Sequence, residues 1–208
     1  HRMMDRMLAT LELLRKREGF GGYIHVKVLP GAEDAQVEAA SVLANRVSIN
    51  LEAPTDAAVR FLSRDKDLTG DLLPKLALAG RLARDAQREP RRFALRSAGT
   101  TTQFVVGAAG EADSQILGLV ARLEGERVLH HAHFSCFQPV VGTPMEALPP
   151  TSPTRELRLY QAEHLLRQYG FRADELVFDR SGNLALDRDP KTSWALAHPE
   201  QFPVELLR

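Results

Sequence analysis

Segments in which apolar and polar residues alternate are interspersed along this chain with segments whose apolar residues recur every three or four positions. The first pattern is typical of strands and the second of amphipathic helices. Strands are expected at four ranges, 23–29, 46–52, 101–106 and 127–134. Helices are expected at 34–44, 56–62, 71–87, 113–123 and 155–169, after a helical stripe of Met and Leu in the first residues. Such alternation predicts an α/β fold with parallel strands joined by crossover helices.

The number of strands limits the architecture, because four strands cannot close a barrel. The opening helix also has no strand before it. We therefore expect residues 1–145 to be the second half of a partial (β/α)6 TIM-like barrel, in a chain that begins mid-protein. The Pro-rich stretch after Gly142 indicates a linker, so residues 146–208 are expected to form a helical C-terminal extension that ends in an irregular acidic tail.

The expected strands carry polar side chains at alternate positions, whereas strands of a parallel sheet are normally apolar on both faces. The apolar positions must meet the helices, so the polar face is expected to line the lumen of the incomplete barrel and to hold a large polar ligand. A sheet with one face in water would give the same pattern. The polar positions are His25, Lys27, Ser48, Asn50, Glu52, Gln103, His131, His133 and Ser135.

A glycine-rich turn, Gly107-Ala-Ala-Gly-Glu111, joins the third expected strand to the next helix. Glycines let a backbone approach a ligand closely, and the free N–H groups at a helix start favour negative charge. Glu111, however, places a carboxylate where a bound phosphate would lie, and two like charges repel. The turn therefore favours a ligand with hydroxyls, an amine or a positive centre.

Composition narrows the class of protein. The 208 residues include 27 Lys and Arg and 27 Asp and Glu, so the overall charge indicates neither nucleic acid nor membrane as a partner. The densest basic run, Gln87–Arg92, is typical of a solvated loop. No apolar run approaches the roughly 20 residues of a membrane span, and a cytoplasmic location is expected. The single cysteine, Cys136, excludes an internal disulfide and any metal or cluster site built from this chain's cysteines alone.

Several segments resemble a known superfamily. Val47–Glu52, Gly107–Glu111 and Phe134–Pro144 are similar to the fourth, fifth and sixth strand ends of radical S-adenosylmethionine enzymes. Gly22–Gly31, Arg158–Arg167 and His198–Pro203 resemble, more narrowly, the DNA modification or repair branch of that superfamily. The segments occur in the right order, and the resemblance spans nearly the whole chain.

The resemblance implies an enzyme that cleaves S-adenosylmethionine reductively to a 5'-deoxyadenosyl radical, with nucleic acid as the expected substrate. It also implies a 4Fe-4S cluster, but the C-x-x-x-C-x-x-C motif that holds it is not in this sequence. The chain alone is therefore expected to be inactive. Its expected partners are S-adenosylmethionine, the missing N-terminal half of the barrel, an electron donor such as flavodoxin or ferredoxin, and DNA.

No catalytic residue is identified, and no metal site is expected. His131 and His133 have the spacing of a metal pair, but histidines that line a lumen are commoner. Glu52 has a structural alternative, an ion pair with Lys66. Two rival functions stay open: a phosphate-binding barrel enzyme such as a sugar-phosphate lyase, and a non-catalytic nucleic-acid-binding module. The residues expected to contact S-adenosylmethionine, from the resemblance and the strand pattern together, are Lys27, Asn50, Glu52, Gln103, Gly107, Gly110 and Glu111.

Overall fold

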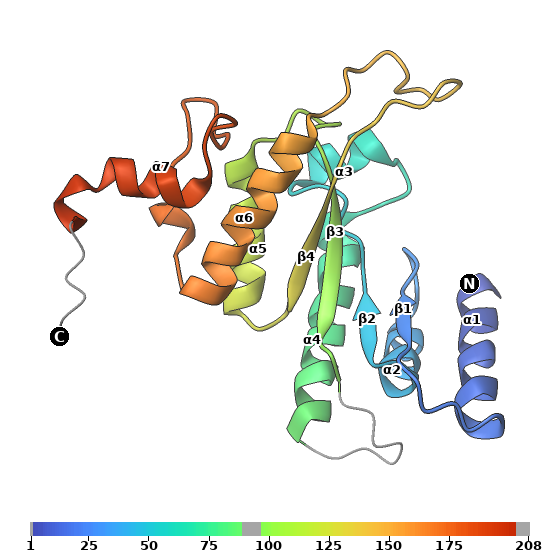
Figure 1. Cartoon of the computed structure of the whole chain (residues 1–208). Coiled ribbons are helices and arrows are strands. Elements are labelled where there is room, and N and C mark those ends of the chain that lie inside the picture. The colour runs from blue at the N-terminus through green and yellow to red at the C-terminus, as the bar shows by residue number, and fades with distance from the viewer. Residues whose placement is uncertain (1, 89–96, 203–208) are drawn as a thin grey trace, which may run out of the picture. The chain divides into compact units, whose positions relative to one another are not determined.

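A computed structural model describes residues 2–88 and 97–202 of the chain, and its elements confirm the expected α/β class (Figure 1). No helix in these ranges combines the length and the apolar character needed to cross a bilayer. The π-helical turns Leu13–Arg17 and Leu68–Leu72 adjoin α1 and α4, and Ala173–Glu175 and Pro199–Gln201 are 3-10 turns. The helices are α1 (Arg2–Glu12), α2 (Asp34–Leu43), α3 (Asp56–Leu62), α4 (Leu73–Arg88), α5 (Asp113–Gly125), α6 (Pro153–Tyr169) and α7 (Pro190–Ala197). The strands are β1 (His25–Lys27), β2 (Arg46–Ser48), β3 (Thr100–Val106) and β4 (His131–Cys136).

The four described strands form one parallel sheet in the order β1-β2-β3-β4. Val26 pairs with Val47, and Val47 pairs in turn with Thr100. An isolated bridge between Glu52 and Phe104 lies beyond the end of β2. β1 is an edge strand of this sheet.

Several predicted segments differ from the structure, and the expected strands 23–29 and 46–52 are shorter, at His25–Lys27 and Arg46–Ser48. The last strand begins at His131 instead of residue 127, because Arg127 has a left-handed φ of 56° and its amide donates to the carbonyl of Glu124 in a turn. The tail expected to be irregular contains α7. Its start has a local cause: Pro190 occupies the first turn, and the carboxylate of Asp189 accepts a hydrogen bond from the Thr192 amide at 2.9 Å.

The described chain divides into two compact units, the first within His1–Phe104 and Leu123–His133 and the second within Val105–Arg122 and Phe134–Arg208. In the first unit, α2 packs against α1, α4 and β2. The apolar positions of β1, of β2 and of the residue after β2 are buried, as shown by Val26, Val47 and Ile49, each 5% exposed or less. Strand alternation therefore separates a buried apolar side from a polar one, as predicted.

Arg15, in the turn after α1, is a buried charge that the sequence pattern does not reveal. Its guanidinium donates to the carbonyls of Leu43 at 2.9 Å, Phe20 at 2.5 Å and Gly22 at 2.8 Å. It also donates to the side chain of Asn45 at 2.9 Å. Burial lowers the pKa of this guanidinium. One side chain thus joins the end of α1, the segment before β1 and the end of α2.

A buried carboxylate organises the second unit. Asp113, at the start of α5, is fully buried, and one of its oxygens accepts a hydrogen bond from Arg155 Nε at 2.8 Å. The other oxygen accepts from the amide of Leu184 at 2.9 Å. Because a buried charge needs partners, this arrangement joins α5 to the start of α6 and to the segment that leads to α7.

Candidate functional site

A polar groove of about 190 Å³ lies on the polar side of the sheet in the first unit. Its lining residues come from all four strands or from the segments that follow them. All of them except Thr102 stand at the alternate strand positions that the sequence pattern places on the polar side. The expected site residues Lys27, Asn50 and Gln103 meet here. The lining residues are His25, Lys27, Ser48, Asn50, Thr101, Thr102, Gln103 and His133.

Asn50 and Gln103 form the polar centre of the groove. Nδ2 of Asn50 donates to Oε1 of Gln103 at 3.2 Å, which links the segment after β2 to β3. Within residues 2–88 and 97–202 this is the single hydrogen bond of either side-chain amide. Each amide can make more than one, so the carbonyl of Asn50 and the amino group of Gln103 are available to a ligand.

Thr101 and Thr102 are the residues of this groove that sequence reasoning missed, and Thr101 is the one with the stronger claim on a ligand. It is fully buried, and its hydroxyl has no hydrogen-bond partner among the described residues. A buried polar group without a hydrogen-bond partner lowers the stability of the fold, so we expect a water molecule or a ligand atom to bind this hydroxyl. Thr101 has the same parity as Gln103 in β3, and that signal would have identified it.

The charged groups of the groove lie toward its exposed side. Lys27 is exposed and makes no ion pair with any described side chain. Partial burial and the positive charge of Arg46 lower the pKa of His25 below 6.5, which leaves its imidazole neutral and able to accept a hydrogen bond at neutral pH. His133 contacts His131, with ring centroids 4.6 Å apart. No Asp or Glu is among the described residues that line the groove, so its charge is neutral to positive.

Glu52 does not line this groove. Its Oε1 lies 2.7 Å from Nζ of Lys66, the ion pair that the sequence offered as the alternative role for this residue. Glu52 also has a φ of 67°, so the strand geometry that governs Asn50 does not extend to it. Its carboxylate therefore belongs to the loop that follows β2.

The turn with Gly107, Gly110 and Glu111 lies in the second unit and is closed on itself. The carboxylate of Glu111 accepts hydrogen bonds from the amide of Gly107 and, at 3.2 Å, from the amide of Ala109. Gly107 has a φ of 90°, and a Cβ placed on it would lie 2.0 Å from the hydroxyl oxygen of Thr151. The glycine thus allows the segment before α6 to approach the turn.

The described ranges offer few side chains that could bind a metal ion together. No group of three or more His, Cys, Asp or Glu side chains there is placed to hold a metal ion. The pKa of the Cys136 thiol is raised by burial and by Glu156, which disfavours the thiolate form that binds metals. Most of the basic run Gln87–Arg92, from residue 89 onward, lies outside the described residues.

Comparison of the chain with models of known protein families, with curated proteins and with solved structures gives no match.

Proposed function

We propose that this chain forms part of a radical S-adenosylmethionine enzyme and that the polar groove is one wall of its cofactor site. The observation that carries the proposal is the convergence of Lys27, Asn50 and Gln103, with the unpartnered hydroxyl of Thr101, on one side of a parallel sheet. Helix-covered parallel sheets do not normally gather polar groups there. A ligand rich in polar groups accounts for them.

The strand order supports the partial barrel that the proposal requires. Barrels place consecutive parallel strands side by side, whereas doubly wound sheets reverse their order at a switch point. The described order, β1-β2-β3-β4, has no reversal. We propose that these strands are the second half of a (β/α)6 barrel and that β1 is the edge at which the first half would pair.

The groove fits part of S-adenosylmethionine and not the iron-sulfur cluster. The amides of Asn50 and Gln103 complement hydroxyl and amino groups, and Lys27 complements a carboxylate. Small-molecule sites usually have volumes of about 300 to 1,000 Å³. A groove of about 190 Å³ would therefore hold one portion of the cofactor. Three thiolates must bind the cluster, and the sequence has one cysteine, so the cluster would be held by another part of the enzyme.

Bound S-adenosylmethionine would supply radical chemistry in the intact enzyme, and an electron donor such as flavodoxin or ferredoxin would be needed. The residues of this chain would bind and orient it. The resemblance to the DNA modification or repair branch supports DNA as the proposed substrate. The glycine-rich turn of the second unit offers few donors to a ligand, because Glu111 already occupies the amides of Gly107 and Ala109.

Those occupied amides also weigh against the first rival function, a phosphate-binding barrel enzyme, because phosphate would need the same donors. The second rival, a non-catalytic nucleic-acid module, requires clustered Lys and Arg, and its binding would fall steeply with salt. Measuring DNA binding of the chain at several salt concentrations separates that module from an enzyme.

The proposal is tested by titrating the chain with S-adenosylmethionine and following its side-chain amides by NMR. We expect saturable shifts of the Asn50 and Gln103 amide groups, and weaker binding by about tenfold in Asn50→Ala, which loses a hydrogen bond to the ligand. Thr192→Ala, in the other unit, is the control and should bind as the wild type does. Titration without saturable shifts in the groove would remove it from the cofactor site.

A further inference from the structure

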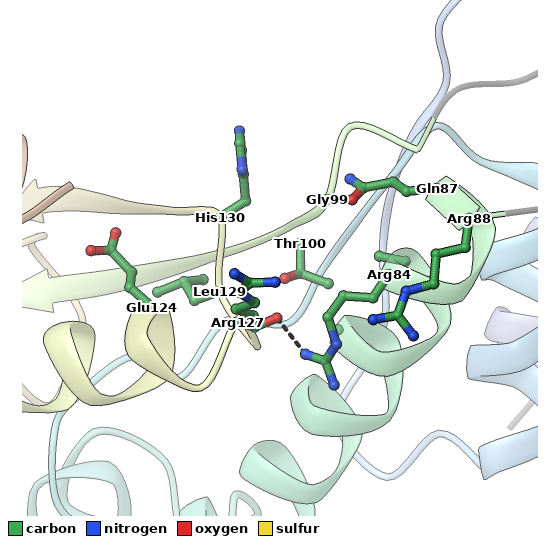
Figure 2. Close-up of a pocket in the computed structure, with 11 residues that line it drawn as sticks. Arg84, Gln87, Arg88, Gly99, Thr100, Glu124, Arg127, Leu129 and His130 are labelled. Atoms are coloured by element: carbon green, nitrogen blue, oxygen red, sulfur yellow. Dashed lines mark hydrogen bonds between the residues drawn. The ribbon is translucent and has the colours of Figure 1, made fainter. Parts of the chain in front are cut away.

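A second cavity, of about 380 Å³, lies in the first unit at the amino ends of β3 and β4 (Figure 2). It is separate from the polar groove, since the two share no lining residue. The last turns of α4 and the turn after α5 form its walls. Its ionisable and amide side chains are Arg84, Gln87, Arg88, Glu124, Arg127 and His130.

Three arginines dominate this cavity. Figure 2 shows the guanidinium groups of Arg84 and Arg88 extending from α4 on the same side, with Arg127 across from them. Nη1 of Arg84 donates to the carbonyls of Arg127 at 2.5 Å and Glu126 at 3.3 Å, which fixes this side chain and leaves its other nitrogens available. None of the three arginines makes an ion pair with a carboxylate of the described residues. The cavity therefore has a positive charge that described acidic side chains do not neutralise by direct contact.

A purely structural role would be to neutralise helix ends. α5 ends at Gly125, and its carbonyl end carries about half a negative charge. Together with Glu124 this helix end offsets about one and a half of the three positive charges in the lining. Helix-end neutralisation thus accounts for Arg84, whose contacts are with carbonyls, and leaves an excess of positive charge at Arg88 and Arg127.

The backbone at Arg127 adds an independent observation. Its φ of 56° is left-handed, a conformation that glycine adopts without strain and that costs energy for a residue with a side chain. Strained residues of this kind concentrate at functional sites. An arginine at this position keeps a cation on the rim of the cavity where glycine would be the more stable choice.

We propose that this cavity binds the phosphate group of a small phosphorylated ligand, of the size of a nucleoside or sugar phosphate. Guanidinium groups match the geometry of phosphate oxygens and form strong charge-assisted hydrogen bonds with them. The volume lies within the range of small-molecule sites. The inference does not depend on the proposed cofactor groove, because it rests on other residues at another edge of the sheet.

Calorimetry of the whole 208-residue chain with adenosine monophosphate, inorganic phosphate and adenosine tests the proposal. We expect saturable binding of the monophosphate and none of adenosine under the same conditions. A higher affinity for the monophosphate than for phosphate assigns a nucleotide as the ligand, whereas equal affinities assign the phosphate group alone. Arg88→Gln and Arg127→Gln should each weaken binding by about tenfold.

The matched control is Arg81→Gln, an exposed arginine of α4 that does not line the cavity, and it should bind as the wild type does. Circular dichroism checks that each variant is folded, and Arg88 is exposed enough that its replacement should not disturb the core. The proposal is overturned if neither phosphate compound binds saturably, or if Arg81→Gln weakens binding as much as Arg88→Gln does. Tight binding of single-stranded oligonucleotides in place of the monophosphate would also overturn it, in favour of an extended nucleic-acid surface.

Discussion

The carboxylate of Glu52 lies 2.7 Å from the ammonium group of Lys66, and these side chains are 13% and 23% exposed. Their contact joins the loop after β2 to the segment after α3. Glu52 holds it from a left-handed backbone conformation with a φ of 67°. An ion pair shielded to this degree loses more when one partner is removed than an exposed pair does, because the other charge is left poorly solvated.

Replacing Glu52 with Gln should therefore lower the free energy of unfolding by about 1 to 2 kcal/mol. Urea denaturation measures the loss, and a double-mutant cycle with Lys66→Met isolates the contribution of the pair. S-adenosylmethionine binding in the groove should be unaffected. If the variant were as stable as the wild type but bound S-adenosylmethionine more weakly, Glu52 would be a residue of the cofactor site and not a structural one.

Gly107→Ala should destabilise the second unit by about 2 kcal/mol or more, since the new methyl group would clash with Thr151 and the φ of 90° strains any side chain. Gly110→Ala is the matched control. Its φ is 70°, but a Cβ there meets nothing within 4 Å, so it should cost about 1 kcal/mol. Equal losses in the two variants, measured by thermal denaturation, would show that the contact with Thr151 does not matter.

His25 should titrate below 6.5, because partial burial and Arg46 disfavour its protonated form. Because the pKa of His25 is lower in the folded than in the unfolded state, its contribution to the free energy of unfolding is present above the unfolded pKa. That contribution is lost as the pH falls through the folded pKa. NMR titration of the imidazole measures the value directly. Arg46→Gln should raise it, and a value that stays the same in this variant would exclude the electrostatic cause.

Cys136 should react slowly with iodoacetamide near neutral pH. Burial and the carboxylate of Glu156 raise its pKa, so the thiolate fraction is small and the rate should increase at a higher pH than for an ordinary cysteine. Glu156→Gln should accelerate the reaction at a given pH. The rate is followed by mass spectrometry, and a wild-type rate equal to that of a cysteine in an unfolded peptide would contradict the expectation.

Strand period predicted several of the residues that share the groove. Lys27, Asn50 and Gln103 lie in different strands or strand ends, yet their parity relative to buried neighbours such as Val26 and Ile49 placed them on one side of the sheet. Strand period identifies the polar side because helices cover one face of the sheet. Apolar side chains must point toward that face, so the alternate positions point away from it.

The same reasoning does not extend to Glu52, because the alternation holds only while the backbone stays extended. β2 ends at Ser48, and the left-handed φ of Glu52 breaks the pattern. Nor could the sequence reveal Arg15 or the bond between Asp113 and Arg155, since these contacts join residues that are far apart in the chain. Local periodicity carries no information about which distant group satisfies a buried charge.

The contacts of Arg15 limit how far the chain can be shortened for experiments. Any truncated version that begins after this residue would remove the donor for the main-chain carbonyls of Leu43 and Gly22 and for the side chain of Asn45. Asn45 also accepts the amide of Ile24 at 2.8 Å, so the loss would reach the entrance of β1. Expression trials that trim the amino end should therefore keep Arg15 together with the helix that carries it.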